Sequence, residues 1–330
     1  MLQNKKIFIS GHKGMVGSSL FNFLKIEKNF KNIIVRSRED LDLTNFHKVD
    51  LFIKKNKPDI IINCAGLVGG IMANNNYPVQ FLVDNIKMQF NLIESAINYK
   101  VKNMIFLGSS CIYPKFAKQP ISEDSLLSGK LEKTNEAYAL AKIVGLKYLE
   151  YCNKQYKKNF VTIMPCNLYG DNDNFDIKNS HFIPALIKKF HLSKIRKINK
   201  IEIWGSGKAK REMMHVSDLT KAIYIILKNL YSKNKLLYKM INNHSYINVG
   251  AGVDYSISYY VSLLKEIINP DCKVIYNKSY PDGTPRKLLD SKIMKNFNWK
   301  PEKKLKNGLK ETYQWFLDNL KYLNQHKVNI

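Results

Sequence analysis

The sequence predicts an α/β protein built on a Rossmann-type, doubly wound parallel sheet, with a smaller α/β C-terminal domain. Apolar runs of strand length alternate with helical patterns through the first half of the chain, an order typical of parallel sheets covered on both faces. The first run, residues 7–9, passes directly into a turn with Gly11, Gly14 and Gly17, and then into a helical pattern. Strand, glycine turn and helix in this order indicate a nucleotide-binding unit.

The later elements continue the alternation. Asp40-Leu-Asp-Leu43 precedes a helix expected to end near residue 57, and residues 60–63 form a buried-type strand that ends in Cys64-Ala-Gly66. Further strands are expected at 33–35, 104–107 and 161–165, and long helices at 78–100 and up to about residue 156. These elements would form one sheet that binds ligands at the carboxyl ends of its strands.

The chain becomes irregular and polar after Asn167-Leu-Tyr-Gly170, so a second domain is expected to begin near residue 171. A helix near Ser217 and a strand near 247–250 should return to the first domain, because a parallel sheet needs cover on both faces. The predicted division places residues 1–170 with 215–250 in the first domain, and residues 171–214 with 251–330 in the second.

The composition is that of a globular protein, since 330 residues that are 45% hydrophobic can fill a sizeable core. No stretch approaches the ~18 apolar residues of a membrane span, and no signal-peptide region precedes the first strand. We therefore expect a cytoplasmic protein without a membrane partner. The five cysteines are scattered and lack CxxC spacing, so neither a disulfide framework nor a metal site is predicted.

The formal charge of +26 is compatible with nucleic acid or with an acidic membrane surface. However, the lysines are spread through the chain rather than gathered into a run, which is typical of solvated faces. We therefore expect no nucleic-acid partner, although a basic surface would help to capture a polyanionic small substrate.

The glycine turn has the spacing GxxGxxG, which lets a pyrophosphate approach the backbone at a helix N-terminus. The alternative is a glycine turn without a ligand. After the second strand, where an acid would favour NAD, the chain has Arg36 and Arg38, and Lys13 lies in the glycine loop. Three cations suit a 2′-phosphate, so NADPH is favoured over NADH. The alternative is an exposed basic turn beside Glu39.

Tyr138 and Lys142 lie four residues apart, on one face of a helix. A lysine ammonium at that distance favours the phenolate, so we expect Lys142 to lower the pKa of Tyr138. Tyr-x-x-x-Lys alone is common and mostly structural. Because Ser109 ends the preceding strand and a dinucleotide loop is present, a catalytic role is favoured here.

These motifs resemble the extended short-chain dehydrogenase/reductases, which include nucleotide-sugar epimerases and dehydratases. Longer stretches across essentially the whole chain are similar to the GDP-L-fucose synthase family, which are bifunctional 3,5-epimerases and 4-reductases of GDP-4-keto-6-deoxymannose. The stretches are Gly108-Ser-Ser-Cys-Ile-Tyr-Pro114, Asn167-Leu-Tyr-Gly170, Asn179-Ser-His-Phe-Ile-Pro-Ala185, Trp204-Gly-Ser-Gly207 with Arg211-Glu212, and Pro281-Asp-Gly-Thr-Pro-Arg-Lys-Leu-Leu-Asp290.

The resemblance implies two sets of catalytic residues. A C4 ketone acidifies the hydrogens on C3 and C5, and Cys111 with His181 would exchange protons there. Ser109, Tyr138 and Lys142 would serve hydride transfer from NADPH to C4. The alternatives are a buried loop thiol for Cys111 and a structural or hydroxyl contact for His181. The resemblance also implies a homodimer formed through helices near 80–98 and 136–156.

The resemblance also assigns binding residues. Arg211 and Lys287 would bind the phosphates of the GDP-sugar, with surface ion pairing as the alternative. The full cofactor set is Gly11, His12, Lys13, Gly14, Met15, Val16, Gly17, Arg36, Arg38, Asp42, Leu43, Ala65, Gly66, Tyr138, Lys142, Pro165, Asn167, Leu168 and His181. The substrate set is Ser110, Asn167, Lys189, Trp204, Arg211, Asp282 and Lys287.

The chain departs from the family pattern at three positions. Lys189 replaces an arginine, Leu67 a lysine and Lys13 an arginine. The first two lie where substrate is expected, so the sugar stays open. The alternative is a C4-reductase for a GDP-4-keto-heptose or another GDP-4-keto sugar that a separate enzyme epimerises. A different class of function is a cofactor-binding regulator without turnover, against which the intact Ser109, Tyr138 and Lys142 argue.

Overall fold

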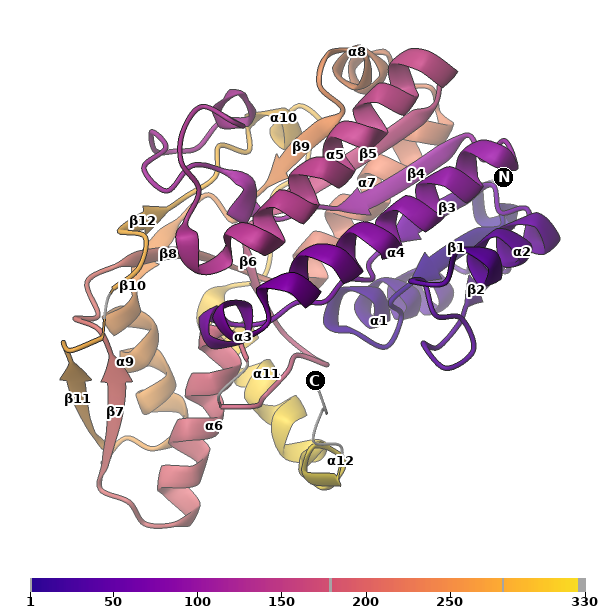
Figure 1. Ribbon diagram of the computed structural model, residues 1–330. Coiled ribbons are helices and arrows are strands. Elements are labelled where there is room, and N and C mark those ends of the chain that lie inside the picture. Colours follow the sequence, from indigo (N-terminus) through magenta and orange to yellow (C-terminus); the bar gives the residue numbers. More distant parts are fainter. Residues whose placement is uncertain (1, 178–179, 281, 326–330) are drawn as a thin grey trace.

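The computed structural model describes residues 2–177, 180–280 and 282–325, and its largest element is a six-stranded sheet in the order β2-β1-β3-β4-β5-β9 (Figure 1). All of its strand pairs are parallel. The strands are β1 Ile7–Ser10, β2 Ile33–Val35, β3 Ile60–Asn63, β4 Asn103–Leu107, β5 Asn159–Pro165 and β9 Tyr246–Val249. Every residue of β1, β3, β5 and β9 is buried, which explains their near-continuous apolar runs.

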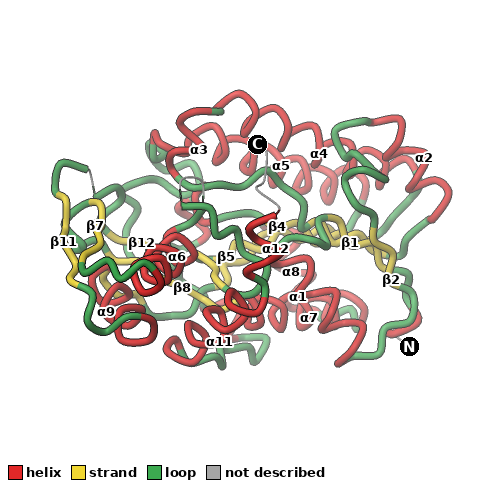
Figure 2. Tube along the Cα trace, turned by 90° about the horizontal axis from the view of Figure 1, so that it is seen from below, coloured by secondary structure: helices red, strands yellow, loops and turns green. Residues whose placement is uncertain are grey.

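Helices cover both faces of this sheet (Figure 2). One face carries α2 Phe46–Asn56, α4 Pro78–Asn98 and α5 Glu136–Tyr156, and the other carries α1 Met15–Asn22, α7 Val216–Tyr231 and α8 Lys235–Asn243. Leu20 of α1 and the following Phe23 and Leu24 are buried. The predicted doubly wound α/β fold is therefore confirmed.

A second layer of structure is assembled from short, distant segments. β8 Lys210–His215 pairs with β6 Asn167–Tyr169, β10 Asp254–Ser256 and β12 Arg286–Lys287, while β7 Lys200–Trp204 pairs with β11 Lys273–Asn277. The remaining helices are α3 Ile71–Asn76, α6 Phe182–Ile195, α9 Ile257–Ile268, α10 Lys292–Lys295, α11 Leu305–Asp318 and α12 Leu320–Gln325, with short turns η1 Leu2–Asn4, η2 Phe23–Glu27, η3 Ser110–Ile112, η4 Glu123–Ser125 and η5 Lys133–Asn135.

This second layer has its own core. Tyr169, Phe190, Tyr260 and Phe316 are almost completely buried in one apolar cluster that includes residues of α6, α9 and α11. We propose to draw the domain boundary between this cluster and the main sheet. Under that division α7 and β9 belong with the sheet, because β9 pairs with β5.

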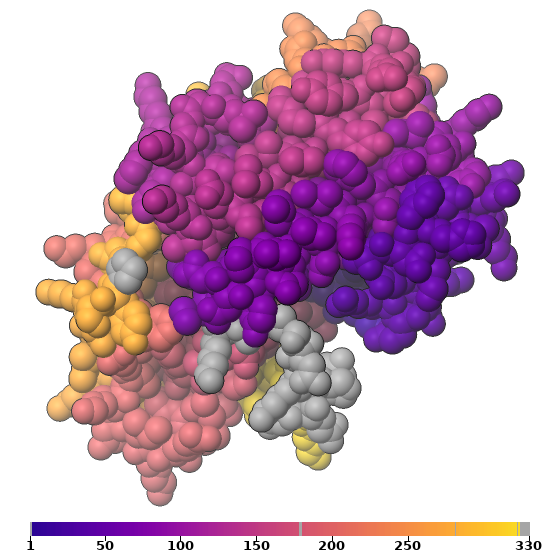
Figure 3. All heavy atoms as spheres, viewed as in Figure 1, coloured from indigo at the N-terminus to yellow at the C-terminus, as the bar shows by residue number. Residues whose placement is uncertain are grey.

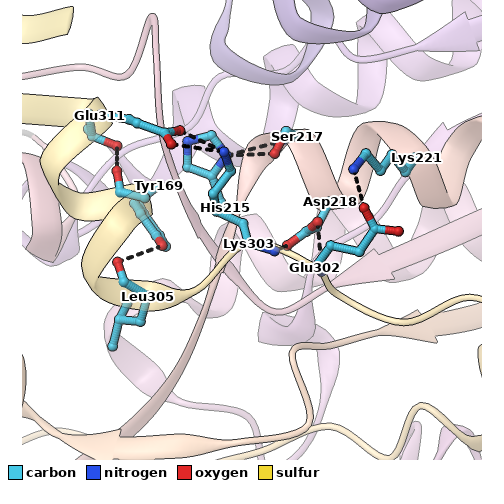
Figure 4. A network of polar contacts seen from close by, with 11 residues as sticks. Tyr169, His215, Ser217, Asp218, Lys221, Glu302, Lys303, Leu305 and Glu311 are labelled. Carbon is cyan, nitrogen blue, oxygen red and sulfur yellow. Dashed lines mark hydrogen bonds and ion pairs between the residues drawn. The ribbon is translucent and has the colours of Figure 1, made fainter. Parts of the chain in front are cut away.

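A polar network joins the C-terminal segment to α7 (Figure 4). The buried Asp218 carboxylate accepts the backbone N–H groups of Glu302 at 3.0 Å and of Lys303 at 3.1 Å. The Asp218 carbonyl accepts the indole N–H of Trp299 at 3.3 Å. These bonds fix the chain leading into α11, where Gly308 packs against the Tyr169 hydroxyl so closely that a Cβ would lie 2.4 Å from it.

Three further sequence expectations can be compared with the structure. All five cysteines are free thiols, and three of them are buried. In the described part of the chain no helix is both long and apolar enough to cross a membrane. Asn179 and Pro281, which begin two of the family-like stretches, lie outside the described residues.

Candidate active site

The site lies at the carboxyl edge of the main sheet, where the parallel strands end together. At the end of β1, the Ser10 hydroxyl donates to Asn63 at the end of β3, and the Ala65 N–H donates to the same Asn63 oxygen at 3.1 Å. The N–H of Gly108, after β4, donates to Ile163 of β5 at 2.9 Å. The predicted cofactor residues Gly11, Ala65 and Gly66 therefore follow strands that end at this edge.

The three glycines of the loop differ in what surrounds them and in whether the backbone requires a glycine. Gly11 has a φ of +71°, and a Cβ on it would lie 2.7 Å from the Ala65 nitrogen. A Cβ on Gly17 would lie 2.2 Å from the Gly11 carbonyl oxygen, so close packing of α1 requires this glycine. A Cβ on Gly14 would meet only that oxygen, at an ordinary 3.5 Å. The protein itself does not require glycine at position 14, which fits a ligand that approaches the backbone at the start of α1.

The end of β2 lies beside the glycine loop. His12 is hydrogen-bonded to the Arg36 backbone, and burial together with Lys13 lowers the pKa of the His12 imidazole. Lys13 Nζ lies 3.8 Å from Glu39 Oε2, and both side chains are exposed. Arg36 stacks over Phe52 at 5.6 Å, and Arg38 is exposed. Lys13 and Arg36 therefore lie at the loop and Arg38 lies near Asp42, while Glu39 partly offsets Lys13.

The remaining cofactor candidates lie after β2, at the start of α1 and at the end of β5. Asp42 accepts the Thr44 N–H at 2.9 Å, which holds the pKa of the Asp42 carboxyl below its usual value, and the carbonyl of buried Leu43 accepts the Asn91 amide at 2.8 Å. Met15 and Val16 open α1, while Pro165 ends β5 and Asn167 and Leu168 open β6.

Ser109 and Tyr138 form a hydrogen-bonded pair, as the catalytic interpretation requires. Ser109 caps η3, and its hydroxyl oxygen accepts the Cys111 N–H at 3.2 Å. Burial, followed by the nearby Cys111 thiol, raises the pKa of Tyr138 well above its ordinary value. The prediction that Lys142 lowers the pKa of Tyr138 is therefore wrong for the protein's own groups, because loss of solvation outweighs any effect of the ammonium.

The Lys142 ammonium is buried, and it donates to the Leu107 carbonyl at 2.8 Å. Nζ lies 5.7 Å from the centre of the Tyr138 ring and 3.6 Å from the position of a Cβ on Gly66. Burial lowers the pKa of Lys142 to about 8. The ammonium thus lies between the tyrosine and the predicted cofactor loop, where it can contact a ribose bound at Gly66.

The Cys111 thiol lies against the same tyrosine. It packs with Leu67 on a small apolar cluster that contains Phe81 and Tyr138. The Asn135 amide donates to Cys111 Sγ at 3.2 Å. Sequence reasoning missed Asn135, although a polar residue three positions before Tyr138 was a signal for it.

Asn85 is a second residue that sequence reasoning missed. Its buried amide bridges the backbone N–H and carbonyl of Leu67 at 2.9 and 3.0 Å, so it holds the loop after β3. This loop contains Gly66 and leads into α3. In the space-filling view the segment of α3 borders the part of the chain near residues 190–210 (Figure 3).

His181 immediately precedes α6 and so comes from the second layer of the fold. Its side chain is exposed, yet the surrounding protein lowers the imidazole pKa through loss of solvation. The neutral imidazole is thereby favoured near pH 7, which suits proton acceptance from a carbon acid.

Four of the substrate candidates cluster around one turn. Asp282 accepts the Ser206 N–H and hydroxyl, both at 2.6 Å, and it lies beside Arg211. The Arg211 guanidinium donates to the Thr284 carbonyl at 2.6 Å. Lys189 lies 5.3 Å over the Trp204 ring, which also stacks on Tyr280 at 4.5 Å. The arrangement offers two cations and an exposed aromatic face.

Arg211 also lies within electrostatic reach of Cys111, which connects this turn to the catalytic residues. Lys287 is next to Arg211 in the sheet, since β12 and β8 pair Lys287 with Arg211. Ser110 is buried within η3 beside Cys111. The candidate residues of the two layers therefore converge on one region. Among the residues that the structure describes, no group of three His, Cys, Asp or Glu side chains could hold a metal ion.

A parallel Rossmann-type sheet with a Ser-Tyr-Lys set at its carboxyl edge defines a nucleotide-dependent α/β oxidoreductase or epimerase. Residues 7–242 match the model of the NAD dependent epimerase/dehydratase family, and the chain belongs to this family. The predicted resemblance to extended short-chain dehydrogenase/reductases is confirmed.

The most similar proteins include enzymes of GDP-sugars. GDP-L-fucose synthase 1 of Arabidopsis thaliana is 42% identical over 96% of this chain and 95% of its own length. A solved GDP-6-OMe-4-keto-L-xylo-heptose reductase from Campylobacter jejuni superposes with a TM-score of 0.89, at 33% identity over 97% of this chain and 99% of that one. A GDP-mannoheptose C4 reductase from the same organism, solved with NADP bound, has a TM-score of 0.84 at 34% identity, over 96% of this chain and 99% of that one.

The two glycines that open α1 provide a test of the cofactor loop. We expect Gly14→Ala to keep the free energy of unfolding within about 1 kcal/mol while weakening binding of NADP about tenfold or more. We expect Gly17→Ala to cost about 2 kcal/mol or more, because its Cβ would overlap the Gly11 carbonyl. Chemical unfolding and cofactor fluorescence titration measure both effects. Unchanged NADP binding by Gly14→Ala would show that nothing approaches the backbone there.

Proposed function

We propose that this enzyme uses NADPH to epimerise C3 and C5 and to reduce C4 of a GDP-4-keto-6-deoxymannose-type sugar, giving GDP-L-fucose or a close analogue. The observation that carries the proposal is that Ser109, a buried Lys142 ammonium and a Cys111 thiol lie together around Tyr138. The first two elements suit ketone reduction, and the thiol suits proton exchange beside the ketone. The similarity to a GDP-L-fucose synthase over 96% of the chain supports the substrate.

Reduction needs a proton donor at the C4 oxygen. When bound, the dihydronicotinamide supplies a hydride to C4. Tyr138 gives its phenolic proton to the oxygen that becomes the C4 hydroxyl, and Ser109 hydrogen-bonds the same oxygen. The raised pKa of Tyr138 keeps this proton on the phenol until the more basic alkoxide develops. Lys142 lies where it can bind the ribose and stabilise the tyrosinate left behind.

Epimerisation needs proton exchange on opposite faces of the sugar ring. The Cys111 thiolate takes a proton from C3 or C5, and the electron pair of the broken C–H bond enters the enolate of the C4 ketone. His181, brought from the second layer, exchanges a proton with the other face. The Arg211 cation from β8 lies within electrostatic reach of Cys111.

A second candidate is reduction of C4 alone, with a GDP-4-keto-heptose as substrate. The TM-scores of 0.89 and 0.84 against two Campylobacter jejuni heptose reductases favour this alternative. Leu67, one of the departures from the family pattern, packs on the same apolar cluster as Cys111. The two candidates share the reductase residues and differ only in whether carbon-bound protons exchange.

Deuterium exchange separates the two candidates. We expect the protein to incorporate solvent deuterium at C3 and C5 of GDP-4-keto-6-deoxymannose in deuterium oxide, as measured by NMR, before NADPH is added. Cys111→Ser should slow this exchange about 100-fold or more, and Tyr138→Phe should slow NADPH oxidation by about 10²–10⁴ while exchange continues. Reduction without any deuterium uptake would favour the heptose-reductase alternative, and unchanged NADPH oxidation by Tyr138→Phe would disprove the reductive mechanism.

We infer that the cations beside the glycine loop bind the 2′-phosphate of NADPH. Replacing both Lys13 and Arg38 by Ala should raise the KM for NADPH about tenfold or more and change the KM for NADH little, because only the phosphate loses its partners. Steady-state kinetics with both cofactors measure the ratio. Lys25→Ala, an exposed lysine on the following η2, is the matched control. Equal effects on both cofactors would contradict the assignment.

We propose that the enzyme is a homodimer joined through α4 and α5. Val79, Val83, Leu140 and Val144 are exposed apolar side chains on these two helices. Light scattering should give a mass near twice 38.3 kDa, and Val83→Glu with Val144→Glu should shift it toward the single chain, because charges are costly in an apolar interface. Ile26→Glu, at a more exposed apolar site on η2, should leave the mass unchanged. A single-chain mass for the unmodified protein would disprove the dimer.

A further inference from the structure

Asn135 occupies a distinctive place in the site. It ends η5 and immediately precedes α5, the helix that carries Tyr138 and Lys142. Its backbone N–H donates to the Glu132 carbonyl at 3.2 Å, and Glu132 is tied to Lys115 by an ion pair of 2.9 Å and to Thr284 by a hydrogen bond of 3.3 Å. The turn is therefore held by contacts that do not involve the Asn135 side chain.

The Asn135 side chain instead faces the thiol. Nδ2 donates to Cys111 Sγ at 3.2 Å, whereas Oδ1 is shielded from solvent without a hydrogen-bond partner among the described residues. A shielded amide oxygen without a partner is costly, so its retention calls for an explanation. A purely structural asparagine would satisfy both ends of its amide.

We propose that Asn135 is a positioning residue for Cys111, which donates its amide N–H to the thiolate and offers its carbonyl oxygen to the thiol. This inference rests on the proposed epimerase function. The side-chain amide has a donor, Nδ2, and an acceptor, Oδ1. Rotation by about 180° about the Cβ–Cγ bond therefore lets it hydrogen-bond either the thiolate or the thiol.

Protons and electron pairs balance over the proposed cycle. In the first state the thiolate accepts the Asn135 N–H. When the thiolate takes a proton from the sugar carbon, an S–H bond forms, the C–H electron pair passes into the enolate, and the new S–H can donate to Oδ1. Return of the proton to solvent restores the thiolate. The amide neither gains nor loses a proton.

Other groups also act on the thiol and must be separated from Asn135. Arg211 from β8 and Tyr138 from α5 lie within electrostatic reach of Cys111, and the Ser109 hydroxyl accepts the Cys111 N–H. Among the described residues, only Asn135 makes a hydrogen bond to the sulfur itself. Isosteric replacement of Asn135 by Asp leaves the other groups in place, removes the donor and introduces a negative charge.

The first test follows the thiol without substrate. Alkylation of Cys111 by iodoacetamide, resolved from the other four cysteines by peptide mass spectrometry, is measured against pH. We expect Asn135→Ala to move the midpoint of the rate profile upward by about one pH unit, a tenfold loss of thiolate. Asn135→Asp should move it further, because a carboxylate repels the thiolate. Lys133→Ala, an exposed side chain of the same turn, should leave the midpoint unchanged.

The second test follows deuterium exchange at C3 and C5. Both Asn135 variants should slow it about tenfold or more at pH 7, with the aspartate variant slower, and higher pH should restore the alanine variant in part. Thermal unfolding verifies that the variants are folded. An alkylation midpoint that does not move in either folded variant would overturn the role of Asn135. Absence of exchange in the unmodified protein would instead overturn the proposed epimerase function, while the alkylation result would still decide the role of Asn135.

Discussion

The parallel pairing of β1, β3, β4 and β5 is the constraint on which the site depends. Because all four strands end at one edge, Gly11, Ala65, Ser109 and the segment after Pro165 meet although they are far apart in the sequence. A slip of one residue along any strand would displace the residue after it by about 3.3 Å, more than a hydrogen bond tolerates. Burial of β1, β3 and β5 over their full lengths makes this register costly to change.

Burial also determines the protonation of the central residues. It favours the neutral phenol of Tyr138 and brings the pKa of Lys142 down to about 8. The hydrogen bond from Lys142 to the Leu107 carbonyl offsets part of this cost and aims the ammonium away from solvent. Tyr138 is therefore a neutral phenol rather than a preformed phenolate, and it can donate its proton to a strongly basic oxygen.

The sequence predicted the parts of the site that depend on local order. The first strand, the glycine turn and the following helix lie where the sequence pattern predicted them, and so does the helix that carries Tyr138 and Lys142. The sheet around β8 could not be predicted, because its strands come from segments near 168, 212, 255 and 286 whose pairing is non-local. The pKa of Tyr138 was predicted in the wrong direction, since spacing reveals the neighbouring charge but not the depth of burial. Asn135 was missed because a contact between two side chains across a turn has no periodic signature.

The two halves of the chemistry depend on different parts of the fold. Ser109 follows β4, and Tyr138 and Lys142 lie on α5, so all three belong to the main sheet layer. Cys111 lies near Arg211 of β8, and His181 precedes α6, so proton exchange beside the ketone also requires the second layer. A change in that layer can therefore alter the sugar or remove the epimerase step while reduction persists. The relatives of this fold include proteins named as GDP-L-fucose synthases and as heptose C4 reductases, which is the division that the proposed separation predicts.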